Sequence, residues 1–560
     1  MNEIQGIGIG QGVAAGPVIR MAEPLPEPVD RPSHLDAARE EERAKASLAV
    51  VADELQRRGA RAGGAAKDVL EAQAMMAEDP TLITDVVARL AEGKTAERAV
   101  YEAFASFREL LAGMGGYLGE RAADLDDVSQ RVVAHLLKVP APGVPDPGHP
   151  FVLVARDLAP ADTAVLDLEQ VLALVTIDGG PTSHTAILAR EQSIVAVVGA
   201  ADAASLADGD QVLVDAEHDV VVVAPDEARL AEARERIAAR KLAAEAPVTP
   251  GALADGTAVP LLANLGSVAG AAEALRLGAE GVGLFRTEFL FLDAERAPSI
   301  TEQQEQYTKL LTEFAGKKVV VRVLDAGADK PLAFLNDAEE ENPALGLRGI
   351  RALRHSETIL REQLTALAAA DAATEAELWV MAPMIATVEE TRYFTALATE
   401  LGIRTAGVMV EVPAAALLAD RVLGACAFAS IGTNDLTQYT MAADRLLGTV
   451  AQLQSPWHPA VLRLIEEVGA AGARTGTPVG ICGEAAADPL LAVVLVGLGA
   501  TSLSMSPSAL ADVRASLARY GLDDARAIAR AALAAEGAAD AKQAAVTAAA
   551  SATAAREGAP

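Results

Sequence analysis

The spacing of hydrophobic residues changes several times along the chain, and each change predicts a different kind of element. Residues 1 to about 20 are rich in glycine and carry apolar positions typical of one or two extended strands. From about 33 to 140, apolar residues recur every three or four positions, so each set falls on one helix face. The four sets are Leu48, Val51 and Leu55; Leu82, Val86 and Leu90; Val100, Phe104, Phe107 and Leu111; and Leu125, Val128, Val132 and Leu136. This stretch is therefore expected to form a block of four amphipathic helices.

A group of short apolar runs follows the proline-rich stretch at 139–147, which has the composition of a linker. The runs are 151–154, 171–177, 194–198, 211–214 and 220–223. Turns and one helix separate them, which is typical of a compact α/β unit. We expect the N-terminal strands to join this unit, so that the helical block is an insertion. Residues 225 to about 246 are expected to form one exposed helix that connects two rigid bodies and acts as a hinge.

Eight further apolar runs alternate with helical segments in the second half of the chain. They are 259–263, 281–285, 319–324, 378–382, 406–410, 427–431, 478–482 and 502–505. Eight strand–helix repeats over this length predict a TIM (β/α)8 barrel. The tail after about 535 is rich in alanine and nearly free of large apolar residues, so we expect a frayed helix or disorder there.

The predicted fold class is multidomain α/β: a swivelling α/β domain with an inserted helical subdomain, followed by a TIM barrel. The expected boundaries are 1–20 plus 144–224 for the α/β domain, 21–143 for the helical subdomain, 225–254 for the linker helix, 255–525 for the barrel and 526–560 for the tail.

Composition narrows the classes of function. The formal net charge of −31 argues against binding to nucleic acid or anionic lipid, and it suits a basic protein partner. The two cysteines, Cys426 and Cys482, form no disulfide framework of the secreted kind, which favours a reducing compartment. The N-terminus has no signal-peptide pattern and no window holds 18 apolar residues. The chain is therefore expected to be cytoplasmic, with no membrane insertion and no nucleic-acid partner.

A first candidate centre is the histidine in the string Gly-Gly-Pro-Thr-Ser-His-Thr-Ala-Ile-Leu-Ala-Arg, residues 179–190. Paired glycines allow a sharp turn, and Thr182 or Ser183 can cap the helix that follows. His184 would then lie near a helix N-terminus, where free N–H groups favour a phosphoryl group. Neutral imidazole is a nucleophile. For an isolated histidine, the competing interpretation is a capped turn in which the histidine has no role.

A second candidate centre is a set of polar residues at the ends of the predicted barrel strands, where TIM barrels place their active sites. The set is Arg286, Arg322, Glu411, Asn434, Asp435, Arg445 and Cys482. Arginine forks bind carboxylate or phosphate in a bidentate manner, and Glu411 and Asp435 offer oxygen ligands of the kind Mg²⁺ takes. Any one arginine–carboxylate pair has a structural alternative, an ordinary salt bridge. Cys482 is either a core thiol or a proton donor to the methylene carbon of an enolate.

The histidine string resembles the phosphohistidine loop of phosphoenolpyruvate-utilising enzymes. Together with the segments 283–289, 431–439 and 480–484, it makes about residues 1 to 525 resemble Enzyme I, the phosphoenolpyruvate-protein phosphotransferase family of the bacterial sugar phosphotransferase system. The resemblance implies that the phosphoryl group of phosphoenolpyruvate passes to the tele nitrogen of His184 and then to a histidine of the phosphocarrier protein HPr, releasing pyruvate. This reaction would be the first step of sugar uptake.

The same resemblance implies roles for the other candidates. It assigns contacts with phosphoenolpyruvate to Arg286, Arg322, Asn434, Asp435 and Arg445, Mg²⁺ binding to Glu411 and Asp435, proton donation to Cys482, and a hydrogen bond with the imidazole to Thr163. The helical subdomain would dock HPr, and the barrel would form a homodimer. One departure is Ala328, where many members of the family carry glycine; the Ala-rich tail also has no family role.

Two alternatives share some of these features. Pyruvate phosphate dikinase and phosphoenolpyruvate synthase share both centres, but they need a nucleotide-binding domain of some 200 residues, for which the chain has no room. They also usually carry alanine where this chain has Thr185. A nonenzymatic regulator that senses phosphoenolpyruvate would be favoured by loss of Glu411, Asp435 or Cys482, and all three are present.

Overall fold

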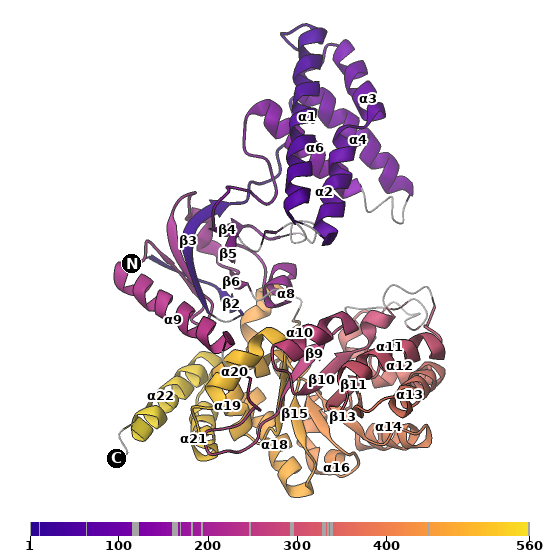
Figure 1. Cartoon of the computed structure of the whole chain (residues 1–560), viewed down its shortest axis with the longest axis vertical. Helices are drawn as coiled ribbons and strands as arrows, with labels where there is room; N and C mark the ends of the chain where they lie inside the picture. The colour runs from indigo at the N-terminus through magenta and orange to yellow at the C-terminus, as the bar shows by residue number, and fades with distance from the viewer. Residues whose placement is uncertain are drawn as a thin grey trace. The chain divides into compact units, whose positions relative to one another are not determined.

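The computed structural model describes residues 2–10, 12–62, 64–114, 122–158, 166–167, 170–180, 183–191, 194–245, 248–291, 296–326, 332, 335, 340–445 and 447–557. The chain divides into two compact units, Met1–Ile237 and Ala238–Pro560 (Figure 1). No helix in the described part is long and apolar enough to cross a membrane.

The first unit contains one mixed sheet that combines the N-terminal strands with the runs after residue 150. Its strands are β1 (Asn2–Gln5), β2 (Ile7–Ile9), β3 (Val13–Arg20), β4 (Phe151–Ala155), β5 (Val171–Thr176), β6 (Val195–Val198), β7 (Gln211–Asp215) and β8 (Val220–Val223). They pair in the order β1-β8-β7-β3-β4-β5-β6-β2. β3 is parallel to β4, with Val18 opposite Val152, so the chain leaves the sheet after β3 and returns to its neighbour. The sequence predicts one or two N-terminal strands; the structure has three in this stretch, because the sequence is interrupted at Gly6 and Gly10.

The helical block lies between β3 and β4. Its helices in the described part are α1 (Ala37–Ala62), α2 (Gly64–Ala77), α3 (Pro80–Ala91), α4 (Ala96–Met114) and α6 (Ala122–Leu137). The four predicted helices are present, and their predicted apolar faces supply buried core residues such as Leu55, Val86 and Val132. The count of four was wrong because α2 buries Leu70 with two alanines, a face too small to stand out in the sequence.

The second unit is a closed parallel barrel. Its strands are β9 (Leu261–Leu265), β10 (Gly281–Arg286), β11 (Lys318–Arg322), β12 (Glu377–Ala382), β13 (Ala406–Val410), β14 (Ala429–Ile431), β15 (Val479–Ile481) and β16 (Ser502–Met505). The helices between and after them are α10 (Ala271–Arg276), α11 (Ile300–Glu313), α12 (Ile350–His355), α13 (Glu357–Ala372), α14 (Val388–Glu400), α15 (Pro413–Leu417), α16 (Ala419–Leu423), α17 (Thr433–Met441), α18 (Pro459–Thr475), α19 (Pro489–Gly497), α20 (Leu510–Leu517), α21 (Leu522–Leu533) and α22 (Ala538–Glu557). Each of the eight predicted barrel runs overlaps a strand, and β16 pairs with β9 to close the barrel.

The Ala-rich tail is helical and packed. In α22 the residues Ala541, Ala545 and Ala549 are buried, and the helix lies against α21 at the yellow end of the chain in Figure 1. The expectation of a frayed or disordered tail is therefore wrong for these residues. Alanines four positions apart form a flat stripe, so a neighbouring helix approaches closely without any large apolar side chain.

The helix predicted between the two rigid bodies is α9 (Glu227–Glu245). The division between the two compact units falls within it, after Ile237. Its first part is fixed to the sheet by Arg236, whose guanidinium binds Asp215 at the end of β7, with Nη1 2.6 Å from Oδ2 and Nη2 3.1 Å from Oδ1.

Candidate functional site

The histidine string begins after β5 and contains most of α8 (His184–Glu191). Gly179 has a φ of 93°, a conformation that residues with a Cβ rarely adopt, so glycine is required at this point of the turn. The Oγ of Ser183 accepts a hydrogen bond from the backbone N–H of Ala186 at 3.2 Å, which caps the helix. His184 is thus the first helical residue, as the sequence predicts. Its side chain and the whole of Thr163 lie outside the described part of the chain, so their roles remain predictions.

A buried threonine fixes the first turn of α8. Thr185 is fully buried, and its Oγ1 donates a hydrogen bond to Oδ1 of Asp157 at 2.8 Å. The backbone N–H of Leu158 donates to the same Asp157 oxygen at 2.9 Å. Ala186 and Ala189 on the next turns pack in the core that includes Leu153 of β4. The residue beside the candidate nucleophile therefore ties α8 to the loop after β4.

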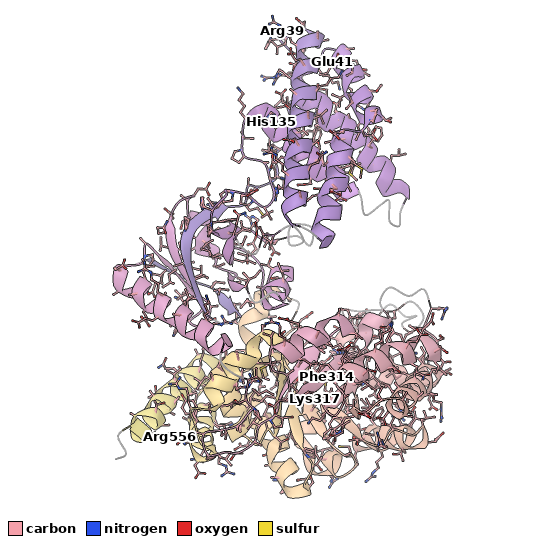
Figure 2. All side chains as sticks on the ribbon, in the orientation of Figure 1. Arg39, Glu41, His135, Phe314, Lys317 and Arg556 are labelled. Atoms are coloured by element: carbon pink, nitrogen blue, oxygen red, sulfur yellow. The ribbon has the colours of Figure 1, made fainter. Side chains whose placement is uncertain are left out.

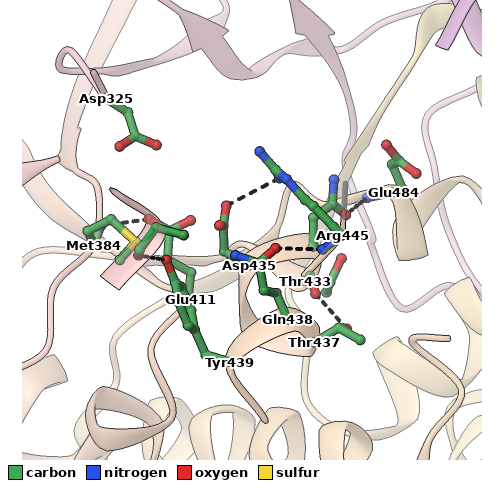
Figure 3. A network of polar contacts seen from close by, with 12 residues as sticks. Asp325, Met384, Glu411, Thr433, Asp435, Thr437, Gln438, Tyr439, Arg445 and Glu484 are labelled. Carbon is green, nitrogen blue, oxygen red and sulfur yellow. Dashed lines mark hydrogen bonds and ion pairs between the residues drawn. The ribbon is translucent and has the colours of Figure 1, made fainter. Parts of the chain in front are cut away.

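The second centre lies at the carboxyl ends of the barrel strands. Arg286 and Arg322 are the last residues of β10 and β11, Glu411 directly follows β13, and Cys482 directly follows β15. Asn434 and Asp435 lie in the first turn of α17, just after β14. Because parallel strands of a closed barrel end at one mouth, these predicted site residues are on the same end of the barrel. Figure 3 shows Asp435 facing Arg445, with Glu411 close by.

Buried ion pairs link these residues to carboxylates that have no assigned role so far. Arg322 Nη2 lies 2.6 Å from Oε1 of Glu288, and Arg322 Nη1 lies 3.0 Å from Oδ2 of Asp325. Arg348 then binds Asp325 and Asp435 through Nη2 and Nη1, each at 2.9 Å. The result is a chain of alternating charges that crosses the barrel mouth.

Arg445 ends this chain. Its Nη1 lies 3.6 Å from Oδ2 of Asp435, and its backbone N–H donates a hydrogen bond to Oε1 of Gln438 at 3.0 Å (Figure 3). Its side chain is 24% exposed, whereas that of Arg348 is 4% exposed. Of the two arginines that bind Asp435, Arg445 is therefore the more accessible to an entering anion.

The network shifts the pKa of its members. Burial alone would lower the pKa of Arg322, but the charges of Glu288 and Asp325 outweigh burial and raise it. Burial raises the pKa of the Asp325 carboxyl, but the charges of Arg322 and Arg348 outweigh burial and hold this pKa below its usual value. These groups are therefore charged at neutral pH.

Glu411 has the opposite environment. Its pKa is raised to about 8, chiefly by burial and then by repulsion from Asp435 and Asp325. Its Oε1 accepts a hydrogen bond from the backbone N–H of Met384 at 2.6 Å. Asp435 and Asp325 thus disfavour the charged form of Glu411, and a cation bound nearby would offset this repulsion.

Cys482 is a buried thiol at the same mouth. It is 3% exposed, and burial raises its pKa to about 11 although a hydrogen bond with Ser430 opposes the shift. Its backbone oxygen accepts a hydrogen bond from Nδ2 of Asn264 at 2.9 Å. The thiol is therefore protonated at neutral pH, the state that a proton donor needs.

The side chains at this mouth supply only some of the ligands that a divalent metal ion needs. Within the described residues, no three or more His, Cys, Asp and Glu side chains form a group that could hold a metal ion. Mg²⁺, however, is often bound by one or two carboxylates and completed by substrate oxygens and water. Glu411 and Asp435 supply such a pair. Three buried polar atoms at the mouth, Oε2 of Glu288, Nε of Arg322 and Oγ1 of Thr433, also have no hydrogen-bond partner among the described residues, as expected where a polar substrate binds.

Sequence reasoning missed three members of the network. Glu288 and Asp325 follow predicted strands and are buried, so the rule that selected Glu411 applied to them as well. Arg348 gives no such signal, because it lies far beyond the end of β11. The one cue is the adjacent Gly349: its φ is 56°, and a Cβ added there would lie 2.8 Å from the Cβ of Met384, so the turn has room only for glycine.

Comparison with known proteins places the chain in a family. Residues 5–121, 147–219 and 240–521 match, respectively, the families "PEP-utilising enzyme, N-terminal", "PEP-utilising enzyme, mobile domain" and "PEP-utilising enzyme, PEP-binding domain". A phosphoenolpyruvate-protein phosphotransferase of Streptomyces coelicolor is 52% identical over 94% of this chain and 96% of its own length. Proteins of the same name from Haloferax volcanii and Geobacillus stearothermophilus are 42% identical over 85% of this chain and 86% of their length, and 38% identical over 94% of both. The chain therefore belongs to the phosphoenolpyruvate-protein phosphotransferase family.

Proposed function

We propose that this chain transfers the phosphoryl group of phosphoenolpyruvate to His184 and then to a histidine of the phosphocarrier protein HPr. It would thereby release pyruvate and begin sugar uptake through the phosphotransferase system. The observation that carries the proposal is the barrel mouth, where Arg322, Arg348 and Arg445 alternate with buried carboxylates. A substrate that carries both a carboxylate and a phosphate needs several rigidly held cations of this kind.

Substrate binding is assigned to the polar groups around the mouth. Arg286, Arg322 and Arg445 would offset the negative charges of phosphoenolpyruvate, and Asn434 and Asp435 would complete the contacts. Asn434 is oriented by its neighbour, since its Oδ1 accepts a hydrogen bond from the backbone N–H of Glu484 at 3.0 Å. Mg²⁺ held by Glu411 and Asp435 would neutralise charge on the phosphoryl oxygens when bound.

The transfer itself breaks one bond and forms one. The bond between phosphorus and the enol oxygen breaks while the Nε2 lone pair of His184 bonds to phosphorus, which leaves the enolate of pyruvate. The methylene carbon of the enolate takes the proton of the Cys482 thiol, and the thiolate regains a proton from water. The high pKa of this thiol, about 11, supports the assignment because the donor is fully loaded before each turnover.

The second half of the reaction needs a protein acceptor. The helical block is inserted in the chain between β3 and β4, two strands of the same unit as α8. Docking of HPr on this block would bring the acceptor histidine to the phosphorylated unit. His184 would have to reach the barrel mouth in one step and HPr in the next, and α9, where the two units divide, is the proposed hinge. We further propose a cytoplasmic homodimer formed through the barrel.

One labelling experiment tests this proposal. The purified chain is incubated with phosphoenolpyruvate labelled in the phosphoryl group and with Mg²⁺, and protein-bound label is counted after acid and after base. We expect a label that is stable to base and labile to acid, as for phosphohistidine. His184→Ala should abolish it, a chelator should abolish it, and added HPr should remove it from the wild-type chain.

A matched control is His149→Ala, because His149 is an exposed histidine of the same unit whose one hydrogen bond within the described residues joins Nδ1 to the backbone oxygen of Pro150. This variant should be labelled normally. Label that appears only when ATP is supplied would instead support the dikinase alternative, and an unlabelled chain would refute the proposal.

A further inference from the structure

A cavity of about 340 Å³ lies in the first unit, between the helical block and the linker that returns to the sheet. It is lined by Val51, Glu54, Arg58, Arg131, His135, Val139, Pro140, Ala141, Val144, Pro145 and Asp146. Arg58 comes from α1, Arg131 from α6, and residues 139–146 from the linker. His135, on the same helix as Arg131, is labelled in Figure 2. The reaction proposed above uses none of these residues.

Two arginines in this lining are almost fully buried. Arg58 is 8% exposed and Arg131 is 6% exposed. Buried arginines in proteins are normally paired with carboxylates, because an unpaired charge costs several kcal/mol to desolvate. The partners of these two arginines therefore need to be counted.

Arg58 makes one hydrogen bond, from Nη2 to the backbone oxygen of Val144 at 3.1 Å, and within the described residues it has no ion pair. Arg131 binds Asp127 through Nε at 2.8 Å, and its two terminal nitrogens have no hydrogen bond within the same part of the chain. An arginine has five N–H donors. Most of the donors on these two side chains therefore lack a protein acceptor, although both side chains line an open cavity.

The two arginines also repel each other. Burial, followed by the charge of Arg131, lowers the pKa of Arg58, and the charges of Glu54, Asp146 and Asp127 offset this only in part. Arg58 remains a cation, since the guanidinium holds its proton throughout the accessible pH range. Such an arrangement is stabilised by an anion that binds both forks.

We propose that this cavity binds a small oxyanion, a phosphate or a carboxylate, between Arg58 and Arg131. The buried end of the cavity is cationic, whereas Glu54 and the exposed Asp146 lie in the same lining. Those carboxylates would repel a polyphosphate, so a compact anion of low charge fits best. Because Arg58 also holds the Val144 backbone, the bound anion would fasten α1 and α6 to the linker.

Hydrogen exchange of the full-length protein, followed by mass spectrometry, tests the site locally. The protein is compared in inorganic phosphate, in succinate, in pyrophosphate and in chloride at matched ionic strength. At a concentration about ten times the dissociation constant, phosphate or succinate should slow exchange about tenfold in peptides covering 51–58 and 131–146. Phosphate and succinate distinguish the two oxyanion sources, and pyrophosphate should give weaker protection. Because peptides are resolved separately, anion binding at the barrel mouth does not confuse the result.

Three variants assign the effect to the two arginines. Arg58→Met and Arg131→Met should lose the protection, and Arg58→Lys, which keeps the charge but not the fork, should retain a reduced part of it. The matched control is Arg57→Met, because Arg57 is the next residue of α1, is 63% exposed and pairs with Asp53. This variant should be protected like the wild type.

Several results would overturn the proposal. These are an unprotected wild-type chain in both phosphate and succinate, equal protection in chloride, or protection that survives in Arg58→Met and Arg131→Met. Far-ultraviolet circular dichroism establishes that each variant is folded, and if a methionine variant does not fold, Arg58→Lys decides the outcome through its reduced protection.

Discussion

The turn that carries His184 and the mouth of the barrel are held together in different ways. At the turn, the hydroxyl of Thr185 donates a hydrogen bond to the carboxylate of Asp157, 28 positions away. Asp157 is exposed, so water can bind its carboxylate if this contact is lost. At the mouth, Arg348 joins Asp435 across 87 positions, and both side chains are buried. Losing a contact therefore costs little at the turn, whereas at the mouth it leaves a charge without a partner in a dry site. The turn should therefore tolerate substitution of the residues that hold it in place. At the barrel mouth the same residues contribute both to stability and to the proposed substrate binding.

The largest expected effect is that of Arg322→Met. The substitution leaves Glu288 without its cation and Asp325 with only Arg348, so we expect the barrel to lose about 3–5 kcal/mol of unfolding free energy. Phosphoryl transfer should fall about 10³-fold, because a cation that offsets charge on the phosphoryl group is removed. Both tryptophans, Trp379 and Trp457, lie in the second unit, so tryptophan fluorescence in urea reports on the barrel.

The control for Arg322 is Arg276→Met in the same unit. Arg276 is 68% exposed and pairs with Glu273 on the same helix, so its loss should leave the unfolding free energy close to that of the wild type. Equal effects of the two substitutions on stability would remove the contrast between the mouth and an ordinary surface pair.

The second effect concerns the thiol. Cys482→Ala should slow pyruvate formation by about 10²- to 10⁴-fold, because a positioned proton donor is removed, while the fold is kept. The chain provides a control in Cys426→Ala, since Cys426 is the other free cysteine and lies outside the mouth. Pyruvate release is measured in both variants. If Cys426→Ala slows it as much as Cys482→Ala does, the thiol at the mouth is not the donor.

The same contrast explains what could be read from the sequence. The eight barrel strands and the start of α8 were predictable because each depends on a run of a dozen residues or fewer. Arg348 was not, because its place beside Asp435 depends on the path of the chain between β11 and α12, and no periodicity describes that path. The helix α22 was missed for another reason. Its buried face consists of alanines such as Ala545, and a sequence without large apolar residues gives no sign of burial until the neighbouring helix is known.

A smaller effect is expected at the turn. Thr185→Val keeps the shape of the side chain and removes the two hydrogen bonds of its Oγ1, which donates to Asp157 and accepts from the backbone N–H of Leu158. Because Leu158 N–H keeps its hydrogen bond to Asp157, we expect a loss of about 1 kcal/mol in the local stability of α8. Transfer to His184 should fall less than about tenfold, because the helix still begins at the same residue. Hydrogen exchange of peptides in α8 measures the first quantity and label uptake measures the second. Thr185→Ser keeps the hydroxyl and should restore both; a valine variant as damaged as Arg322→Met would contradict the comparison.

The smallest effect is expected from another contact of the first unit, that between the exposed His218 and the buried Asp215. His218 Nδ1 lies 2.9 Å from Oδ2 of Asp215, and this hydrogen bond is the main reason that the pKa of His218 is raised. Because the pKa of His218 is higher in the folded state than in the unfolded state, the pair contributes its full stabilisation at pH values below the pKa of the unfolded state. This stabilisation is lost as the pH rises through the pKa of the folded state. Since the His218 side chain is 68% exposed, solvent screening limits the gain to about 0.5 kcal/mol or less.

His218→Gln should therefore be slightly less stable than the wild type at about pH 5.5 and equal to it at about pH 9, as measured by hydrogen exchange in β7 and α9. Arg229→Met serves as the control, because Arg229 lies on α9, pairs with Glu3 and not with Asp215, and does not titrate over this range, so its loss should cost the same at both pH values. A deficit in His218→Gln that stays constant with pH would show that the imidazole acts by packing alone. A deficit as large as that of Arg322→Met would show that the contacts of the first unit are as tightly coupled as those of the barrel mouth.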